Sequence, residues 1–196
     1  MDGPTDGLPL TDAELVRRAR GGDTTAYDDL VRRHQAVAQR AAWLATGSAE
    51  EAADAAQEGF VKAWQALDRF REDAEFRPWL LRIVVNTARN RRRSAWRFDA
   101  MRVRAAAATP PTAATSAEAQ ALEHAEHDEL LAALRRLPAR DRAVVGCRYL
   151  LELSESETAT VLGVPAGTVK SRLSRALRRL RAELRDTDLA LSGGGA

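Results

Sequence analysis

Hydrophobic residues recur at steps of three and four along most of the chain, a period that predicts helices rather than strands. Glycines, prolines and polar stretches interrupt this pattern and divide it into segments of helical length. Eight segments result, at about residues 11–20, 23–45, 48–67, 78–93, 117–137, 139–151, 154–162 and 166–184. The fold class is therefore expected to be all-α.

Polar residues at the starts of several segments have the spacing of helix caps. Thr11 with Glu14, and Ser48 with Glu51, match the capping box, in which each side chain binds the backbone N–H of the other residue. Pro78 suits the first turn of the fourth helix, where a missing N–H leaves no hydrogen bond unmade. These residues support the predicted starts of three helices.

The apolar face of each helix is expected to form the core. In the third helix this face holds residues at helical spacing, namely Ala53, Ala56, Phe60, Val61 and Trp64. Trp79 in the fourth helix and Cys147 also fall in apolar patterns and are expected to be core residues. Cys147 is the single cysteine of the chain, which excludes a disulfide within it.

Residues 105–116 read AAAATPPTAATS, with a Pro-Pro pair and no apolar periodicity, a composition typical of a flexible and disordered linker. We therefore expect two small helical domains, at residues 8–97 and 118–186, joined by a flexible linker at residues 98–117. Residues 187–196, which end in LSGGGA, are expected to be a disordered tail.

The distribution of charge is more informative than its sum. The chain has 30 basic and 28 acidic residues, so its net charge of +2 alone does not indicate a partner. Residues 89–104 contain seven arginines and one acid, and residues 170–185 contain seven basic residues and one acid. Two separated basic clusters predict two contacts with a polyanion.

The stretch GVPAGTVKSRLSRALRRL, residues 163–180, admits two interpretations. A phosphate-binding loop needs its second glycine directly before the lysine, so that backbone N–H groups and the ammonium converge on one phosphate. Here Gly163 and Gly167 are only four residues apart, and two residues separate Gly167 from Lys170. This spacing argues against a phosphate loop and against a phosphate-hydrolysing enzyme.

The second interpretation is a helix-turn-helix, because a short helix and a glycine-containing turn precede the long last helix. One side of that last helix is apolar, with Val169, Leu173, Ala176, Leu177, Leu180 and Leu184. The opposite side holds Ser171, Ser174, Arg175 and Arg178, flanked by Lys170 and Arg179. A basic, hydroxyl-bearing face of this kind is suited to the major groove, where Arg binds guanine and Ser binds several bases.

Four stretches together support a family resemblance. In the second half these are LPARDRAV at residues 137–144 and LGVPAGTVKSRLSRA at residues 162–176. In the first half they are DAAQEGFVKAWQALDRF at residues 54–70 and FRPWLLRIVVNTARN at residues 76–90. The two pairs resemble domain 4 and domain 2 of bacterial sigma factors of the extracytoplasmic-function type, in the sigma-70 family. The resemblance extends over almost all of residues 10–185, with no domain 3 between.

The resemblance implies a factor that binds core RNA polymerase and directs it to a two-part promoter, with no enzymatic activity and no cofactor. Domain 4 would read the −35 element in duplex form. Its implied DNA-binding residues are Thr168, Lys170, Ser171, Arg172, Ser174, Arg175 and Arg178. The alternative function is a stand-alone helix-turn-helix regulator, which leaves the basic end of the fourth helix unexplained.

Domain 2 of such a factor reads and opens the −10 element. The implied residues are Asn86, Arg89, Asn90 and Arg93 on the fourth helix, and Phe70 in the loop at residues 68–75. The loop would hold a base that has been flipped out of the stack, with an aromatic surface that offsets the cost of unstacking.

The third helix carries the implied polymerase-docking surface, formed by Asp54, Gln57, Glu58 and Lys62. The resemblance implies contacts with the clamp helices of the largest polymerase subunit and with the flap. Relatives are often held inactive by an anti-sigma factor, and the residues of this chain leave open whether it has one.

Three further expectations follow from the sequence. His124 and His127 are three residues apart, but the surrounding acids fit a solvated helix face, so no metal site is expected. The N-terminal MDGPTDGLPL lacks the apolar core of a secretory signal, so we expect a cytoplasmic protein without membrane insertion. Thr158 stands where the family usually has a larger aliphatic residue, which predicts thinner packing there.

Overall fold

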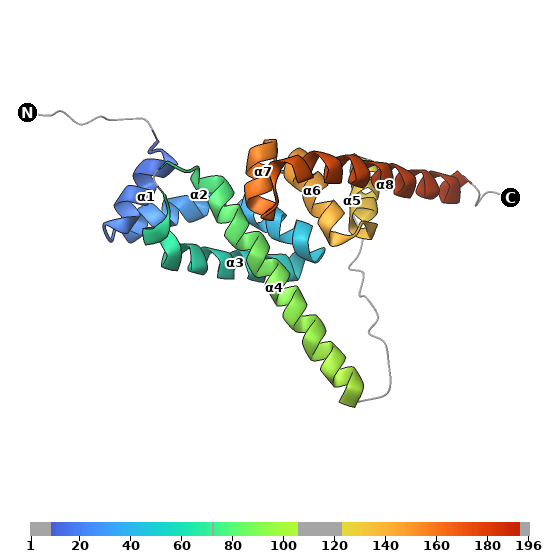
Figure 1. Cartoon of the computed structure of the whole chain (residues 1–196), viewed down its shortest axis with the longest axis horizontal. Coiled ribbons are helices and arrows are strands. Elements are labelled where there is room, and N and C mark those ends of the chain that lie inside the picture. The colour runs from blue at the N-terminus through green and yellow to red at the C-terminus, as the bar shows by residue number, and fades with distance from the viewer. Residues whose placement is uncertain (1–8, 72, 106–122, 193–196) are drawn as a thin grey trace, which may run out of the picture.

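The computed structural model describes residues 9–71, 73–105 and 123–192, and every regular element in these ranges is a helix (Figure 1). The elements are α1 (Asp12–Arg20), α2 (Thr24–Thr46), α3 (Ala49–Ala66), the 3₁₀ helix η1 (Leu67–Arg69), α4 (Phe76–Ala105), α5 (Glu123–Arg136), α6 (Ala139–Tyr149), α7 (Glu155–Leu162) and α8 (Ala166–Ser192). The prediction of an all-α fold is confirmed. Within the described residues, no helix is both long and apolar enough to cross a membrane.

The predicted caps define where several helices begin and end. The capping box of α1 is complete: the Glu14 N–H donates to Thr11 Oγ1 (3.3 Å) and the Thr11 N–H donates to Glu14 Oε2 (2.7 Å). At α3 the Glu51 N–H donates to Ser48 Oγ (3.4 Å), and this single bond is the cap of that helix. Gly47 ends α2 in the left-handed conformation, with φ of 81°, which favours glycine.

Helices α1 to α4 contribute the first part of one continuous apolar core. Leu15, Leu30, Leu80 and Val84 are fully buried in it. Helices α3 and α4 approach closely at Gly59, where an added Cβ would lie 2.7 Å from Val84 Cγ2. This close packing fixes the face that α3 can present to solvent.

Helices α5 to α8 contribute the rest of the same core, in which Val144, Leu153, Val161 and Val169 are fully buried. Helix α7 ends at Gly163, which adopts φ of 66° in the left-handed region. After this turn, α8 begins at Ala166, so the predicted helix-turn-helix is present.

The two halves of the chain pack against each other, with α6 on α2 and α7 on α4 (Figure 1). Arg142 of α6 is only 4% exposed; its Nε donates to the Leu44 carbonyl (2.9 Å) and its Nη1 to the Arg135 carbonyl (3.0 Å). A Cβ on Gly146 would overlap the side chain of Leu44, so the contact depends on a residue without a side chain. Buried arginine donors and close helix packing therefore hold the halves together.

Two helices extend beyond the boundaries expected from the sequence. Helix α4 continues to Ala105, and its last turns project from the body of the molecule (Figure 1). Helix α8 continues to Ser192, six residues into the segment expected to be a tail. No proline or glycine interrupts either extension, and alanine, arginine and leucine favour helix. The rest of the predicted linker, residues 106–117, and residues 193–196 lie outside the described residues.

The predicted core face of α3 is partly wrong. Ala56 and Phe60 are buried as expected, but Ala53 is exposed, Val61 is 51% exposed and Trp64 is 39% exposed. The apolar stripe of α3 is wider than the surface that α2 and α4 cover, so one edge of it remains in contact with solvent. Trp79 is half-buried and Cys147 is buried, as predicted.

Candidate functional site

The polar face of α8 is the first candidate surface, and the structure places it in solvent. Five of the predicted DNA-contacting residues are exposed: Lys170, Ser171, Ser174, Arg175 and Arg178. Thr168 and Arg172 are half-buried at its edge. On the opposite side, Val169, Ala176 and Leu180 are buried against the rest of the helix-turn-helix. The amphipathic pattern therefore holds α8 in place and leaves its cationic side accessible.

Local contacts fix the start of α8. The Thr168 N–H donates to the Pro165 carbonyl (2.9 Å), and Ser171 Oγ donates to the Thr168 carbonyl (3.1 Å). Arg179, which flanks the polar face, forms an ion pair with Asp141 of α6, whose side chain is buried. Arg179 thus joins α8 to α6, while Arg175, one turn earlier, remains exposed.

The polar face of α4 is the second candidate surface, and it is less open. Asn86, Asn90 and Arg93 are exposed, but Arg89 is half-buried and its Nη1 donates to the Leu162 carbonyl at the end of α7 (3.3 Å). Burial lowers the pKa of the Arg89 guanidinium, and the neighbouring charge of Arg172 lowers it further. The predicted −10 surface therefore meets the helix-turn-helix at Arg89.

Two other arginines of the same basic cluster form contacts within the first half. Arg91 bridges two acids of α3, with Nη2 2.7 Å from Asp54 Oδ2 and Nη1 3.1 Å from Glu58 Oε2. Arg92 donates from Nη1 to the Ala45 carbonyl (3.3 Å), near the end of α2. Part of the charge that the sequence assigns to nucleic acid is therefore paired inside the protein.

The loop between η1 and α4 differs from its prediction at Phe70. The ring of Phe70 is only 5% exposed and packs against Phe76 and Trp79, with centroids 5.9 and 5.0 Å away. In this conformation it offers no aromatic surface to a base, because the apolar interior of α1 to α4 takes up the ring. The exposed residues of the loop come after it: Arg71 binds Asp73 through Nε (3.0 Å) and Nη2 (2.6 Å).

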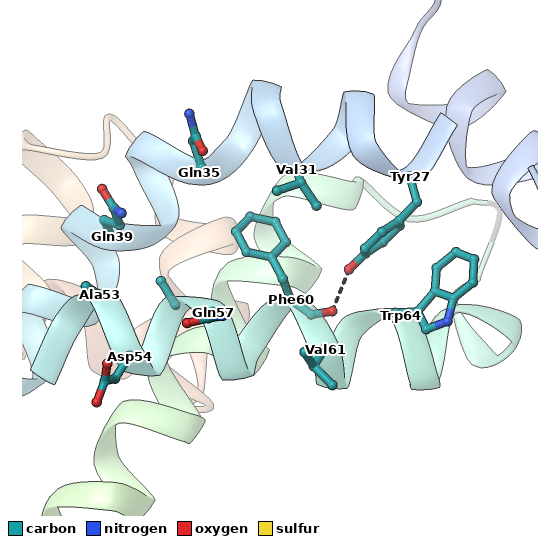
Figure 2. Close-up of a pocket in the computed structure, with 11 residues that line it drawn as sticks. Tyr27, Val31, Gln35, Gln39, Ala53, Asp54, Gln57, Phe60, Val61 and Trp64 are labelled. Carbon is teal, nitrogen blue, oxygen red and sulfur yellow. Dashed lines mark hydrogen bonds between the residues drawn. The ribbon is translucent and has the colours of Figure 1, made fainter. Parts of the chain in front are cut away.

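A groove of about 520 Å³ runs between α2 and α3 (Figure 2). Figure 2 shows Tyr27 and Trp64 at one end and Gln39 and Asp54 at the other. The rings of Tyr27 and Trp64 lie 4.8 Å apart, and the Tyr27 hydroxyl donates to the Phe60 carbonyl (2.5 Å). Burial raises the pKa of Tyr27 to about 12, so this hydroxyl stays protonated and continues to donate. The groove therefore has an aromatic end at Tyr27 and Trp64 and a polar end at Gln39 and Asp54.

The predicted docking residues divide between this groove and the side of α3 that faces α4. Asp54 and Gln57 line the groove. Glu58 is paired with Lys62, whose Nζ is 2.6 Å away, and with Arg91 of α4; hydrogen bonds from these two cations lower the pKa of Glu58. Glu58 and Lys62 therefore join α3 to α4 rather than line the groove.

Sequence reasoning missed the part of the groove that α2 contributes. Val31, Gln35 and Gln39 line it, at the spacing of one side of a helix. The signal was available, since two glutamines at i and i+4 follow an apolar residue on one side of α2. This spacing alone is the same for residues that line a groove and for residues on an ordinary solvated helix face.

Comparison with known proteins relates both halves of the chain to one family. Residues 30–98 match sigma-70 region 2, and residues 127–180 match sigma-70 region 4. The RNA polymerase sigma factor NccH of Alcaligenes xylosoxydans xylosoxydans is 33% identical over 185 residues, which are 92% of this chain and 98% of NccH. The ECF RNA polymerase sigma factor SigM of Mycobacterium tuberculosis is 37% identical, over 87% of this chain and 83% of SigM.

A solved structure has a similar arrangement of the helices. CnrH, in complex with the cytosolic domain of CnrY, superposes with a TM-score of 0.64 at 31% sequence identity. The superposition covers 90% of this chain and 98% of CnrH. The similarity therefore extends to nearly the whole of both chains.

Proposed function

We propose that three surfaces of this chain bind the −35 element, the −10 element and core RNA polymerase. The chain belongs to the sigma-70 family of RNA polymerase sigma factors, of the extracytoplasmic-function type. It is an alternative sigma factor that directs promoter-specific transcription initiation. A stand-alone helix-turn-helix regulator is not favoured, because region 2 is present together with region 4. Proteins of this family bind polymerase and DNA rather than catalyse a reaction, and we propose that this chain has no enzymatic activity of its own.

The exposed face of α8 is the single observation that supports this proposal most strongly. We propose that Lys170, Ser171, Ser174 and Arg175 contact bases of the −35 element. Arg178, Arg172 and Thr168 would then contact the DNA backbone at the edges. Arg and Ser donors on the first turns of a recognition helix are suited to the major groove, and the buried leucine side of α8 holds that orientation.

The exposed amides of α4 support a separate proposal for the −10 element. Asn86 and Asn90 lie on the open part of the helix, and Arg93 is exposed beyond them. Arg89 would join this surface only after α7 releases it, because its guanidinium now donates to the Leu162 carbonyl. The loop at residues 71 and 73–75, rather than the ring of Phe70, would then receive the flipped base.

The groove between α2 and α3 is the proposed site for core polymerase, and a helix of its largest subunit is the partner that we expect there. Val61 and Trp64 expose apolar surface beside Asp54 and Gln57, so the groove offers apolar contacts with polar groups at its rim. An anti-sigma factor is a second proposed partner for this chain. We further propose that it acts in the cytoplasm, where polymerase acts.

Binding both promoter elements at once requires the halves to separate. The −35 and −10 positions are about 25 base pairs apart, a distance of about 85 Å along B-DNA at 3.4 Å per base pair. In the structure the two DNA-contacting surfaces are neighbours, since Arg89 of α4 donates to the Leu162 carbonyl of α7, and α7 packs against α8. We propose that the closed arrangement is that of the free protein and that promoter binding opens it.

Run-off transcription tests the proposed function directly. Purified core polymerase is mixed with this protein and with promoter fragments selected by the reconstituted holoenzyme. A sigma factor makes core polymerase start at one position on each fragment, whereas a stand-alone regulator leaves core polymerase unable to start. Absence of a complex between the protein and core polymerase at low salt would contradict the proposal.

A further inference from the structure

Arg20, the last residue of α1, binds a run of backbone carbonyls at the base of the loop that precedes α4. Its Nε donates to the Leu67 carbonyl (2.9 Å), and its Nη2 donates to the carbonyls of Asp68 (3.1 Å) and Phe70. The contacts span 47 to 50 residues of sequence, so they tie two distant segments together. The guanidinium suits this task because its donors lie in one rigid plane.

The same contact joins a fixed segment to an exposed one. On the fixed side, Leu67 is 3% exposed and Phe70 is 5% exposed, with the ring of Phe70 held among aromatic neighbours. On the other side, Arg71, Asp73, Ala74 and Glu75 are all exposed. Arg20 therefore fixes the backbone at the point where the chain leaves the core and enters the loop.

Such an anchor has a consequence for recognition of a flipped base. A loop that is already held in its binding conformation loses less conformational entropy when a base enters, so more of the contact energy appears as affinity. Extruding the base costs unstacking energy, which only a well-placed acceptor site can offset. The position of the exposed loop residues thus depends on the carbonyls that Arg20 holds.

We propose that Arg20 is a positioning residue for the loop that receives the flipped −10 base, and this rests on the proposed function of that loop. Arg20 acts through the backbone of residues 67–70 rather than through contact with DNA. Its removal therefore reduces recognition of one base and spares the other contacts with DNA and polymerase.

The test uses holoenzyme and a single-stranded probe, the non-template strand of the −10 element from selected promoters. An abasic site is placed at each position in turn, and affinity is measured by fluorescence anisotropy. For the unchanged protein we expect the abasic site at the flipped position to weaken binding about tenfold, the scale of one stacked base, in addition to any loss at positions that Asn86 or Asn90 contacts. The ratio to compare is the dissociation constant of that abasic probe divided by that of the intact probe. In Arg20→Ala this ratio falls towards one, because the intact probe binds more weakly while the abasic probe binds as before.

Two further variants make the result specific. Arg20→Lys keeps the charge but has a compact donor that cannot hold three carbonyls in one plane, so we expect an intermediate ratio. Arg17→Ala removes a charge from the same helix, and Arg17 lines the same small pocket as Arg20 and Phe70. This control should keep the ratio of the unchanged protein. If Arg20→Ala does not fold, the comparison of Arg20→Lys with Arg17→Ala decides the question.

The outcomes separate this proposal from the proposed function. If no abasic position matters for the unchanged protein, the loop does not hold a base and the proposed −10 mechanism is wrong. If one position matters and Arg20→Ala keeps the full ratio, the loop function stands and the role of Arg20 is wrong. Weaker core binding, with equal losses on every probe, would show Arg20 to be a structural residue only.

Discussion

The basic faces of α4 and α8 look alike in sequence but differ in what their cations do. On α8, Lys170, Arg175 and Arg178 are exposed. On α4, Arg91 is paired with two acids of α3, and Arg92 binds a carbonyl near the end of α2. A cluster of arginines in sequence therefore overstates the charge available to DNA when its helix crosses other helices.

The difference follows from how each helix is packed. Helix α8 lies along one side of its half (Figure 1). Val169, Ala176 and Leu180 are buried on its apolar side, and Lys170, Arg175 and Arg178 are exposed on the other. Helix α4 contacts α2, α3 and α7, so neighbours surround its first turns on several sides. If the second half moves away, the α4 face is expected to become as accessible to DNA as the α8 face.

The largest expected effect is that of Arg142→Ala, which removes the buried arginine between the halves. The substitution leaves the Leu44 and Arg135 carbonyls without their donor, but only the bond to Leu44 crosses between the halves. Losing that one charged hydrogen bond costs about 1.5–3 kcal/mol. That shifts the balance between closed and open forms about 10- to 100-fold. We expect a larger radius of gyration by small-angle X-ray scattering and stronger binding of the −10 strand by the free protein.

Arg178→Ala is the matched control for this experiment. It removes an exposed arginine from α8 and leaves the contact between the halves untouched. We expect no change in radius of gyration for this variant. An Arg142→Ala protein as compact as the unchanged one would mean that the remaining contacts maintain the closed form, namely the packing at Gly146 and the bonds from Arg77 to Leu151 and from Arg89 to Leu162.

The second prediction concerns the open face. Arg175→Ala is expected to weaken binding to the −35 duplex by about 1–3 kcal/mol, if Arg175 holds a guanine through two hydrogen bonds. The measurement is competition between the selected −35 sequence and a scrambled duplex at fixed salt. Equal losses on both duplexes would show a phosphate contact instead. Arg181→Ala, an exposed arginine further along α8, is the control and should have a small, sequence-independent effect.

The third prediction concerns the partly covered face. Asn86→Ala is expected to reduce promoter opening about tenfold, the scale of one specific base contact, while core binding stays intact. Permanganate reactivity of unpaired thymines in the −10 element measures the opening. Arg82→Ala, exposed one turn earlier on α4, is the control. Loss of core affinity in Asn86→Ala would overturn the assignment of this residue to DNA.

The sequence predicts what depends on neighbours in the chain. The Thr11 capping box, the end of α7 at Gly163 and the two sides of α8 are local patterns, and the structure contains all three. Contacts between distant segments were not predictable in this way. Arg142 donates to a carbonyl that lies 98 residues earlier in the sequence. Arg20 donates to carbonyls that lie 47 to 50 residues later.

Burial was predicted where the neighbouring helices cover the whole apolar stripe, as on α8, and was missed where they cover only part of it, as on α3. Helical periodicity identifies an apolar stripe but not how much of it another helix covers. Phe60 and Trp64 belong to the same stripe of α3, yet one is buried and the other forms the end of a groove. Phe70, which the family resemblance placed at the surface that holds a flipped base, is buried because its ring packs against Phe76 and Trp79 of the next helix.

The smallest expected effect is that of a substitution in α7. This helix packs against both α4 and α8 and so contacts both helices that carry the compared faces. Thr158 is fully buried there, and its hydroxyl is without a hydrogen-bond partner among the described residues. Thr158→Val replaces this hydroxyl with a methyl of similar size, which removes the desolvation cost of an unpaired polar group. We expect a gain of about 1 kcal/mol in the free energy of unfolding and a rise of about 2–4 °C in melting temperature.

Thr160→Val is the matched control, because Thr160 is exposed on the same helix and its hydroxyl donates to the Ser156 carbonyl (3.1 Å). Removing that hydroxyl gives up a hydrogen bond without relieving a buried group, so no gain is expected. Chemical denaturation of both variants measures the difference. A loss of stability in Thr158→Val would contradict this prediction. It would mean that the Thr158 hydroxyl has a hydrogen-bond partner in solution, such as a buried water beneath α7.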